Sequence, residues 1–326
     1  MRRARLYRYQ VPMDAGVVLR NQRLKSRIGL VVHLEQDDRT GEGEIAPLPG
    51  FSLESIDQAE SIARLWLTQW AGGNEMSFDG VPPSVAFGLS CALAESDGRM
   101  PMSSCWQSVP LCTGDPDLLF DQLSCLPGRK IAKIKVGLYE PIRDSLLVNT
   151  LLEALDDLHL RLDANRAWTP DKAASFLRWL NPAVIDRIDF IEEPCGLPTQ
   201  SLAFAAQSGI PIAWDESSRE PGFTLEALPG VAAVIIKPTL TGSLAYCQQR
   251  IAGVHQAGML AVVSSALESS LGLGQLSGLA QQLTPDAPPG LDTLSLMQAQ
   301  VVRPWPASTL PLLDYADLSL IGVVES

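Results

Sequence analysis

Residues 131–137 read IAKIKVG and residues 159–165 read HLRLDAN, and this pattern of a short apolar run that ends in charged residues decides the fold. Amphipathic stretches of helical length separate such runs. The alternation predicts parallel βα units, whose strands are buried on both faces. The same pattern recurs further along the chain in RIDFIEEP (187–194), IPIAWDE (210–216), AAVIIKP (232–238) and MLAVVSSAL (259–267).

The spacing of the strand ends is regular. Steps of 28, 29, 23, 22 and 27 residues, about one βα unit each, join the successive positions Lys135, Asp163, Glu192, Asp215, Lys237 and Ser264. Six consecutive units favour an α/β fold of the TIM-type (β/α) barrel over a doubly wound sheet. The sequence has no clear GxGxxG or GxxxxGK[ST] motif, which argues against dinucleotide and P-loop folds.

The first hundred residues have a different pattern, typical of an α+β unit. Strands are predicted near 6–10, 29–35 and 41–45, and helices at 53–71 and 83–95. We expect residues 1–100 to form a capping domain, to which a tail of about 300–326 returns, and residues 101–299 to form the catalytic barrel.

The composition excludes several classes of partner. The 326 residues include 25 Lys and Arg against 37 Asp and Glu, and the resulting net charge of −12 repels nucleic acids and anionic membranes. The basic N-terminus lacks the apolar segment and cleavage site of a signal peptide. We therefore expect a cytoplasmic protein that binds neither nucleic acid nor membrane. Its expected partner is a small-molecule carboxylate substrate, and it is expected to be a monomer.

The cysteines do not indicate a metal site. None of the six forms a CxxC pair, and the chain has only three histidines, so zinc is not expected. We expect all of them to be buried free thiols, since cysteine often acts as a small apolar residue. They are Cys91, Cys105, Cys112, Cys125, Cys195 and Cys247.

Three successive strand ends supply carboxylates, namely Asp163 in RLDANRAW, Glu192 in FIEEP and Asp215 in AWDES. Because carboxyl ends of barrel strands meet at one rim, these groups would repel one another without a cation among them. Hard oxygen ligands suit Mg²⁺ or Mn²⁺. The alternative is that each carboxylate caps the helix after its strand.

Lysines flank this predicted rim. Lys133 and Lys135 share one face of their strand, and Lys237 ends a strand two positions beyond that of Glu192. Each alone could be a solvated charge. Together with a divalent cation they would stabilise an enediolate, so they suit removal of a proton next to a carboxylate. Nearby cations would favour the neutral, basic form of Lys135.

These motifs, in this order, resemble the o-succinylbenzoate synthase family of the enolase superfamily. The resemblance covers nearly the whole chain, is closest to the enterobacterial branch, and implies a barrel modified as in that superfamily. The barrel motifs are KIKVG, RLDANRAWTP, FIEEP, IAWDES, IIKPTLTGS, SSALESSLGL and GLDTLSLMQ, and the N-terminal ones are GEGEIAPLPGFS and PPSVAFGLSCAL.

The resemblance implies Asp163, Glu192 and Asp215 as ligands of Mg²⁺, with Mn²⁺ as a substitute. It implies that Glu193 lies behind the ligands rather than among them. The other site residues have separate implied roles: Lys135 as the base that later protonates the departing hydroxyl, Lys237 as the enolate-stabilising cation, and Lys133 and Ser264 as substrate-binding residues. Family members often have a third serine where this chain has Ala266.

The implied reaction is syn dehydration of 2-succinyl-6-hydroxy-2,4-cyclohexadiene-1-carboxylate to 2-succinylbenzoate in menaquinone biosynthesis. Other superfamily enzymes share the lysine framework, including N-acylamino acid or dipeptide racemases and epimerases and the muconate cycloisomerases. Outside that group, a Schiff-base aldolase and a non-catalytic barrel binding protein stay open.

The loop at residues 12–27 is rich in basic residues. Arg20, Arg23, Lys25 and Arg27 accompany the small residues Ala15 and Gly16 in this loop. It would either close over the barrel mouth as a lid or form a solvated basic turn.

Overall fold

The computed structural model of the chain describes residues 1–14, 17–19, 22–101, 108–112 and 116–325. They form two compact units, each assembled from separate segments. Unit 1 comprises Met1–Gln107, Ile236–Ile251 and Val263–Ser326, and unit 2 comprises Ser108–Ile235 and Ala252–Val262. Within the described residues no helix is long and apolar enough to cross a membrane.

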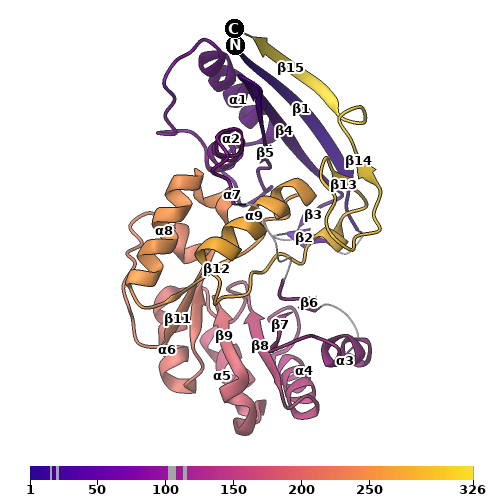
Figure 1. Cartoon of the computed structure of the whole chain (residues 1–326). Coiled ribbons are helices and arrows are strands. Elements are labelled where there is room, and N and C mark those ends of the chain that lie inside the picture. Colours follow the sequence, from indigo (N-terminus) through magenta and orange to yellow (C-terminus); the bar gives the residue numbers. More distant parts are fainter. Residues whose placement is uncertain (15–16, 20–21, 102–107, 113–115, 326) are drawn as a thin grey trace. The chain divides into compact units, whose positions relative to one another are not determined.

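Unit 1 contains an antiparallel sheet with the strand order β15-β1-β4-β5. A two-residue turn at Asp37 and Asp38, both with positive φ, joins β4 to β5, as expected for a tight hairpin. β15 pairs with β1, so the two ends of the chain lie side by side (Figure 1). The strands are β1 (Arg2–Pro12), β4 (Ser26–Gln36), β5 (Arg39–Ile45) and β15 (Ser319–Glu325).

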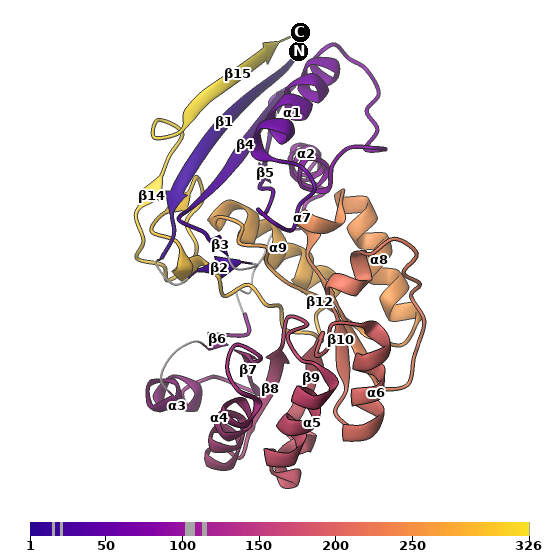
Figure 2. The same cartoon turned by 180° about the vertical axis from the view of Figure 1, so that it is seen from behind.

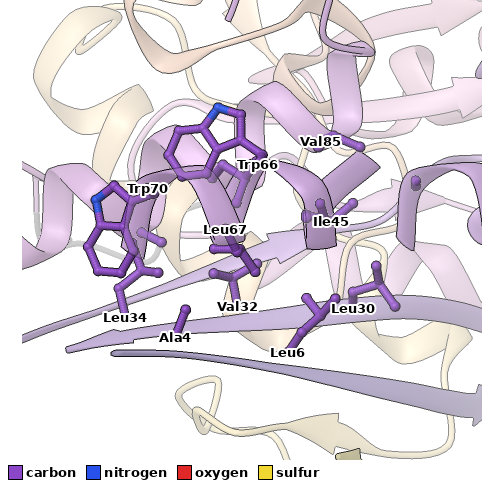
Figure 3. Close-up of a cluster of buried hydrophobic side chains, with 14 of the residues drawn as sticks. Ala4, Leu6, Leu30, Val32, Leu34, Ile45, Trp66, Leu67, Trp70 and Val85 are labelled. Atoms are coloured by element: carbon purple, nitrogen blue, oxygen red, sulfur yellow. The ribbon is translucent and has the colours of Figure 1, made fainter. Parts of the chain in front are cut away.

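Helix α1 (Ile56–Ala71) supplies the largest side chains of the core of unit 1. A capping box between Ser55 and Gln58 fixes its first turn. Figure 3 shows Trp66 and Trp70 of this helix beside the apolar side chains of the sheet. Both tryptophans are buried, and each such burial contributes roughly 2 to 3 kcal/mol before entropy is counted.

Helix α2 (Pro83–Ser96) packs closely on β5 because two strand residues lack a side chain. A Cβ added to Gly41 would lie 2.0 Å from the Ala92 carbonyl oxygen, and one added to Gly43 would lie 1.9 Å from that of Gly88. Both obstacles are backbone atoms. The GEGE sequence is therefore required for contact between this helix and the sheet.

Unit 2 is built around a parallel sheet with the order β12-β11-β10-β9-β8-β7-β6, which confirms the βα alternation. Helices α4, α5 and α6 lie along it (Figures 1 and 2). Its strands are β6 (Leu111–Cys112), β7 (Lys130–Lys135), β8 (Leu158–Asp163), β9 (Ile188–Glu192), β10 (Ile212–Trp214), β11 (Val231–Ile236) and β12 (Leu260–Val263).

The remaining elements connect or flank these sheets. The helices are α3 (Pro116–Ser124), α4 (Pro141–Ala154), α5 (Pro170–Trp179), α6 (Pro198–Ser208), α7 (Pro238–Thr241), α8 (Leu244–Gln256) and α9 (Ser270–Leu283). The short strands are β2 (Val18–Leu19), β3 (Gln22–Arg23), β13 (Gln300–Val301) and β14 (Leu312–Leu313), and the 3₁₀ turns are η1 (Pro182–Arg187), η2 (Glu216–Arg219) and η3 (Leu294–Leu296).

The interpretation of the basic loop is wrong at one residue. Arg27 is only 1% exposed, inside β4, because its guanidinium group donates to main-chain carbonyl groups. Arg23 and Lys25 are exposed. Ala15, Gly16 and Arg20 lie outside the described residues, and the lid stays a prediction.

The expectation that every cysteine is a buried free thiol is wrong for Cys125, which is exposed directly after α3. Burial is correct for Cys91, Cys112, Cys195 and Cys247, all free thiols. Burial raises the pKa of the Cys91 and Cys247 thiols, so they are poor nucleophiles. Cys105 lies outside the described residues.

Candidate active site

The ends of β7, β8 and β9 bring a lysine and two carboxylates together in unit 2. In the parallel register Lys135 pairs with Asp163, and Asp163 pairs with Glu192. The Lys133 ammonium group lies between the carboxylates, 2.9 Å from Asp163 Oδ2 and 2.6 Å from Glu192 Oε2. Both acids are buried, at 4% and 3% exposure. The predicted neighbours therefore do lie side by side at the strand ends.

Burial and charge compete within this group. Burial alone would lower the pKa of Lys133, but the charges of Asp163 and Glu192 outweigh it and raise that pKa well above its ordinary value. Lys133 is thus held as a cation. Burial, together with the negative charges of Asp163 and Asp215, raises the pKa of Glu192. These shifts indicate a site of strongly negative potential that attracts cations.

Asp215 follows β10 and is 1% exposed, with its Oδ1 accepting a hydrogen bond from Arg219 Nη1 at 2.6 Å. Among the residues that the structure describes, no three His, Cys, Asp or Glu side chains form a group that could hold a metal ion. Lys133 and Arg219 contact the carboxylates instead. The structure thus joins Asp163 to Glu192 but does not gather all three acids, and the metal site stays a prediction.

Helix capping, the alternative role for these acids, is seen only in part. Asp163 Oδ1 accepts from the backbone N–H of Asn165 at 3.1 Å, a local turn. Asp215 occupies the N-cap position of η2 without a capping hydrogen bond from its side chain. Glu192 ends its strand, and Lys133 donates to it. Capping therefore does not explain the burial of all three acids.

Glu193 directly follows Glu192 and braces the turn that carries Asp215. Its Oε1 accepts from the N–H groups of Asp215 and Ser217, both at 2.9 Å. Its Oε2 accepts from Ser217 Oγ at 3.0 Å and from Arg166 Nε at 3.2 Å. The Glu193 side chain is 1% exposed, and its bonds to Asp215 and Ser217 are buried. Glu193 is therefore placed to orient Asp215.

The backbone at these strand ends adopts a conformation that side-chain-bearing residues rarely accept. Asn165 and Arg166, just after Asp163, have φ values of 43° and 61°, and Glu193 has 38°. A residue held in this conformation lowers the stability of the fold by about 1 kcal/mol or more, and such residues cluster at functional sites. Here the Glu193 hydrogen bonds hold the strained segments in place.

Lys237 and Ser264 belong to unit 1. Lys237 directly follows β11 and is the N-cap residue of α7, with its carbonyl oxygen accepting from Leu240 N at 2.9 Å. Ser264 directly follows β12, and its Oγ donates to the Gly290 carbonyl oxygen at 3.3 Å. In the sheet order, β11, which Lys237 follows, is two strands from β9 on one side. β7, which carries Lys135, is two strands from β9 on the other side.

Sequence reasoning missed two arginines near the acids. Arg219 is four residues after Asp215, a spacing that places both on one face of a helical turn and could have been noticed in AWDESSR. Arg161 is 4% exposed on β8 and pairs in register with Lys133. The sequence feature that could have indicated Arg161 is a cation two residues before Asp163, on a strand otherwise expected to be apolar.

Comparison with known proteins identifies the family. Residues 1–96 match the family model "MenC, N-terminal domain", and residues 126–283 match "Enolase C-terminal domain-like". The curated o-succinylbenzoate synthase of Yersinia pseudotuberculosis is 60% identical over 321 residues, which cover 98% of this chain and 99% of that protein.

Solved structures share the fold at lower identity. The o-succinylbenzoate synthase of Thermosynechococcus elongatus, described as complexed with Mg in its active site, aligns with a TM-score of 0.72 and 23% identity over 95% of this chain and 96% of its own. The L-Ala-D/L-Glu epimerase of Bacillus subtilis aligns with a TM-score of 0.70 and 17% identity over 91% of each chain. These likenesses confirm the modified barrel with its capping domain. The identity to the Yersinia enzyme is decisive: the chain belongs to the o-succinylbenzoate synthase family of the enolase superfamily.

Proposed function

We propose that the chain dehydrates 2-succinyl-6-hydroxy-2,4-cyclohexadiene-1-carboxylate to 2-succinylbenzoate, a step of menaquinone biosynthesis. As a member of its family the chain is a carbon–oxygen lyase that acts on a small molecule. The observation that carries the proposal is the register that sets Lys135 beside Asp163 and Asp163 beside Glu192. This register supports Lys135 as a base beside the buried acids, because barrel enzymes act at the carboxyl ends of their strands.

The acids fit a divalent metal by their chemistry. Enzymes of this superfamily depend on a metal, and three carboxylates without Cys or His suit Mg²⁺ better than zinc. Lys133 and Arg219 both contact the acids, which supports a site that attracts cations. We propose that Asp163, Glu192 and Asp215 hold Mg²⁺, with Mn²⁺ as a substitute. The ion, when bound, would stabilise negative charge that develops on the substrate carboxylate.

The chain's own residues perform the proton transfers in this proposal. Lys135, as the neutral amine, removes the proton next to the substrate carboxylate and later returns a proton to the departing hydroxyl, which gives syn loss of water. Lys133 stays charged because its carboxylate neighbours raise its pKa, so it offers a fixed cation to the substrate carboxylate. Lys237 stabilises the enolate electrostatically, and Ser264 seats the succinyl end.

The other assignments concern the domains, the location and the partners of the protein. We propose residues 1–100 with about 300–326 as the capping domain and residues 101–299 as the barrel. We further propose a cytoplasmic monomer that binds a carboxylate substrate. The net charge of −12 supports the expectation that it does not bind nucleic acid or membrane. The 60% identity to a synthase favours dehydration over the epimerase and cycloisomerase reactions.

The deciding experiment follows ring aromatisation by ultraviolet absorbance with purified protein and the cyclohexadiene substrate. Activity that EDTA removes and Mg²⁺ restores is the expected result, because the acids need a divalent ion to act. Full activity in EDTA would refute the metal site. Tight product binding without turnover in Mg²⁺ would instead identify a binding protein, and a borohydride-trapped substrate adduct would identify a Schiff-base enzyme.

A further inference from the structure

The loop between β12 and α9 carries Ser264, and its conformation is strained. Ser265 N donates to the Gly290 carbonyl oxygen at 2.9 Å, which anchors the start of the loop. Leu267 has a φ of 62°, in the left-handed region that a leucine rarely occupies. A bulky residue stays in this region only where its surroundings fix it. The contacts of this loop within unit 1 therefore decide where Ser264 lies.

Arg27 of β4 supplies one of these contacts. Its Nε donates to the Leu267 carbonyl oxygen at 2.7 Å, which fixes the strained residue directly. Its Nη1 donates to the Pro47 carbonyl oxygen at 2.7 Å on the segment after β5. The side chain is 1% exposed. One buried guanidinium group thus joins the loop to β4 and to the segment after β5, both more than 200 residues away in sequence. The ammonium group of lysine does not reproduce this geometry.

Glu44 of β5 holds the other end of the loop. Its Oε1 accepts from Ser269 N at 2.9 Å, and its Oε2 accepts from Ser269 Oγ at 2.8 Å and Gly272 N at 2.7 Å. The carboxylate therefore caps α9 from a distant strand, as an acid should at a helix N-terminus. Tyr9 of β1 donates a further hydrogen bond to Glu44 Oε1. A Cβ on Gly272 would lie 2.4 Å from Glu44 Oε2 and 2.8 Å from Glu268 Cβ, so a side chain here would displace both buried acids.

Glu268 completes the support from inside the loop. Its Oε2 accepts from Ser265 Oγ at 2.8 Å and from Ala266 N at 2.6 Å, and the residue is 1% exposed. These bonds fix the loop's shape, whereas Arg27 and Glu44 fix its position. Ala266 is thus held through its backbone N–H.

We propose that Arg27 and Glu44 are positioning residues for substrate binding, which act by holding the Ser264 loop against the antiparallel sheet of unit 1. The inference rests on the proposed role of Ser264 in seating the succinyl end. It gives the sheet of the capping domain a part in specificity, although neither positioning residue needs to touch the substrate.

The test uses Arg27→Lys and Glu44→Gln, each alone and combined with Ser264→Ala, in the full-length protein with Mg²⁺. Arg64→Lys and Glu60→Gln are matched controls, because they alter an ion pair on the surface of α1 in the same unit. Loss of one hydrogen bond to substrate, on the order of 1 kcal/mol, makes Ser264→Ala raise KM about fivefold. Because they act through Ser264, each positioning variant should raise KM about three- to fivefold, no more than Ser264→Ala itself, and lower kcat less than about threefold.

The double variants separate positioning from general damage. If Arg27 and Glu44 act through Ser264, then Ser264→Ala should change KM less than about twofold in either background. Full additivity of the two effects would refute the proposal. A merely structural role would lower the amount of folded enzyme and leave KM unchanged.

Hydrogen exchange gives a readout that does not depend on activity. Amides of residues 265–272 should exchange at least about tenfold faster in Arg27→Lys and Glu44→Gln than in the controls, while those of residues 30–34 keep their protection. Wild-type exchange in the loop would overturn the proposal. A wild-type protein that fails to dehydrate the substrate would overturn the proposed function instead, and the exchange result would still decide whether these two residues hold the loop.

Discussion

Replacement of Glu193 tests how the Asp215 turn is held. Its carboxylate accepts four hydrogen bonds while 1% exposed, two of them from the backbone N–H groups of Asp215 and Ser217. Glu193→Ala leaves these donors without their partner in a buried place. At roughly 1 kcal/mol for each lost bond, the free energy of unfolding should fall by about 3 to 4 kcal/mol.

Glu193→Gln separates charge from shape. The glutamine carbonyl oxygen can keep both backbone donors, while its amide group faces Arg166 and Ser217 in place of Oε2. Only the bond to Arg166 must be lost, since the Ser217 hydroxyl can rotate to accept. The expected loss of stability is therefore about 1 to 2 kcal/mol.

The assays are urea-induced unfolding followed by circular dichroism and steady-state dehydration with Mg²⁺. Because a displacement of about 1 Å in a catalytic group can cost on the order of 100-fold, kcat/KM should fall about 100-fold in Glu193→Ala and about tenfold in Glu193→Gln. Glu220→Gln is the control, since exposed Glu220 also bonds Arg166, and it should stay within about twofold of wild type. Wild-type stability and kcat/KM in Glu193→Ala would refute the bracing role.

Three further predictions concern the bases, acid stability and the packing of α2. Lys135→Ala and Lys237→Ala should each reduce dehydration to background while circular dichroism shows a folded protein, and a wild-type rate in either variant would contradict its assigned role. Although burial opposes it, hydrogen bonds from His33 and Tyr315 and the charge of Arg303 lower the pKa of Glu42 from 4.5 to about 2. Because this folded-state pKa lies below the unfolded one, Glu42 should contribute on the order of 3 kcal/mol above about pH 4.5, lost as the pH falls towards 2. Urea unfolding at pH 2 to 7 should therefore show a smaller loss of stability on acidification in Glu42→Gln than in wild type, and equal pH dependence would exclude the effect. Gly43→Ala should lower the free energy of unfolding by about 1 to 3 kcal/mol, because its Cβ meets the Gly88 carbonyl oxygen. Gly72→Ala, whose Cβ has its nearest contacts at 3.5 Å, should leave the free energy of unfolding unchanged. Equal stability of the two variants would contradict the packing argument.

The sequence predicted the parts of the site that follow from local periodicity. Parallel strands of regular spacing place their carboxyl ends at one edge, so the order of the motifs alone makes Lys135, Asp163 and Glu192 neighbours. The two helices and three longer strands of the first hundred residues were also predicted, with shifts of a few residues at their ends, but the two-residue strands β2 and β3 were not.

Contacts between distant segments could not be predicted in this way. Arg27 resembled a solvated residue of a basic loop, but carbonyl groups near residues 47 and 267 enclose it. Nothing in its local sequence encodes these partners. The partners of Asp215 were missed for a related reason: Arg219 is close in sequence, but Glu193 reaches the turn only because neighbouring strands align.

The pairing of β1 with β15 has a consequence for biosynthesis. β1 (residues 2–12) leaves the ribosome early, but the strand that covers its outer edge, residues 319–325, is made only after some 300 further residues. Until then the nascent chain presents an open strand edge, to which another nascent copy can add. Expression should therefore yield more intact protein when chaperones are abundant, and a circular permutant that joins residue 325 to residue 2 would close this edge during translation.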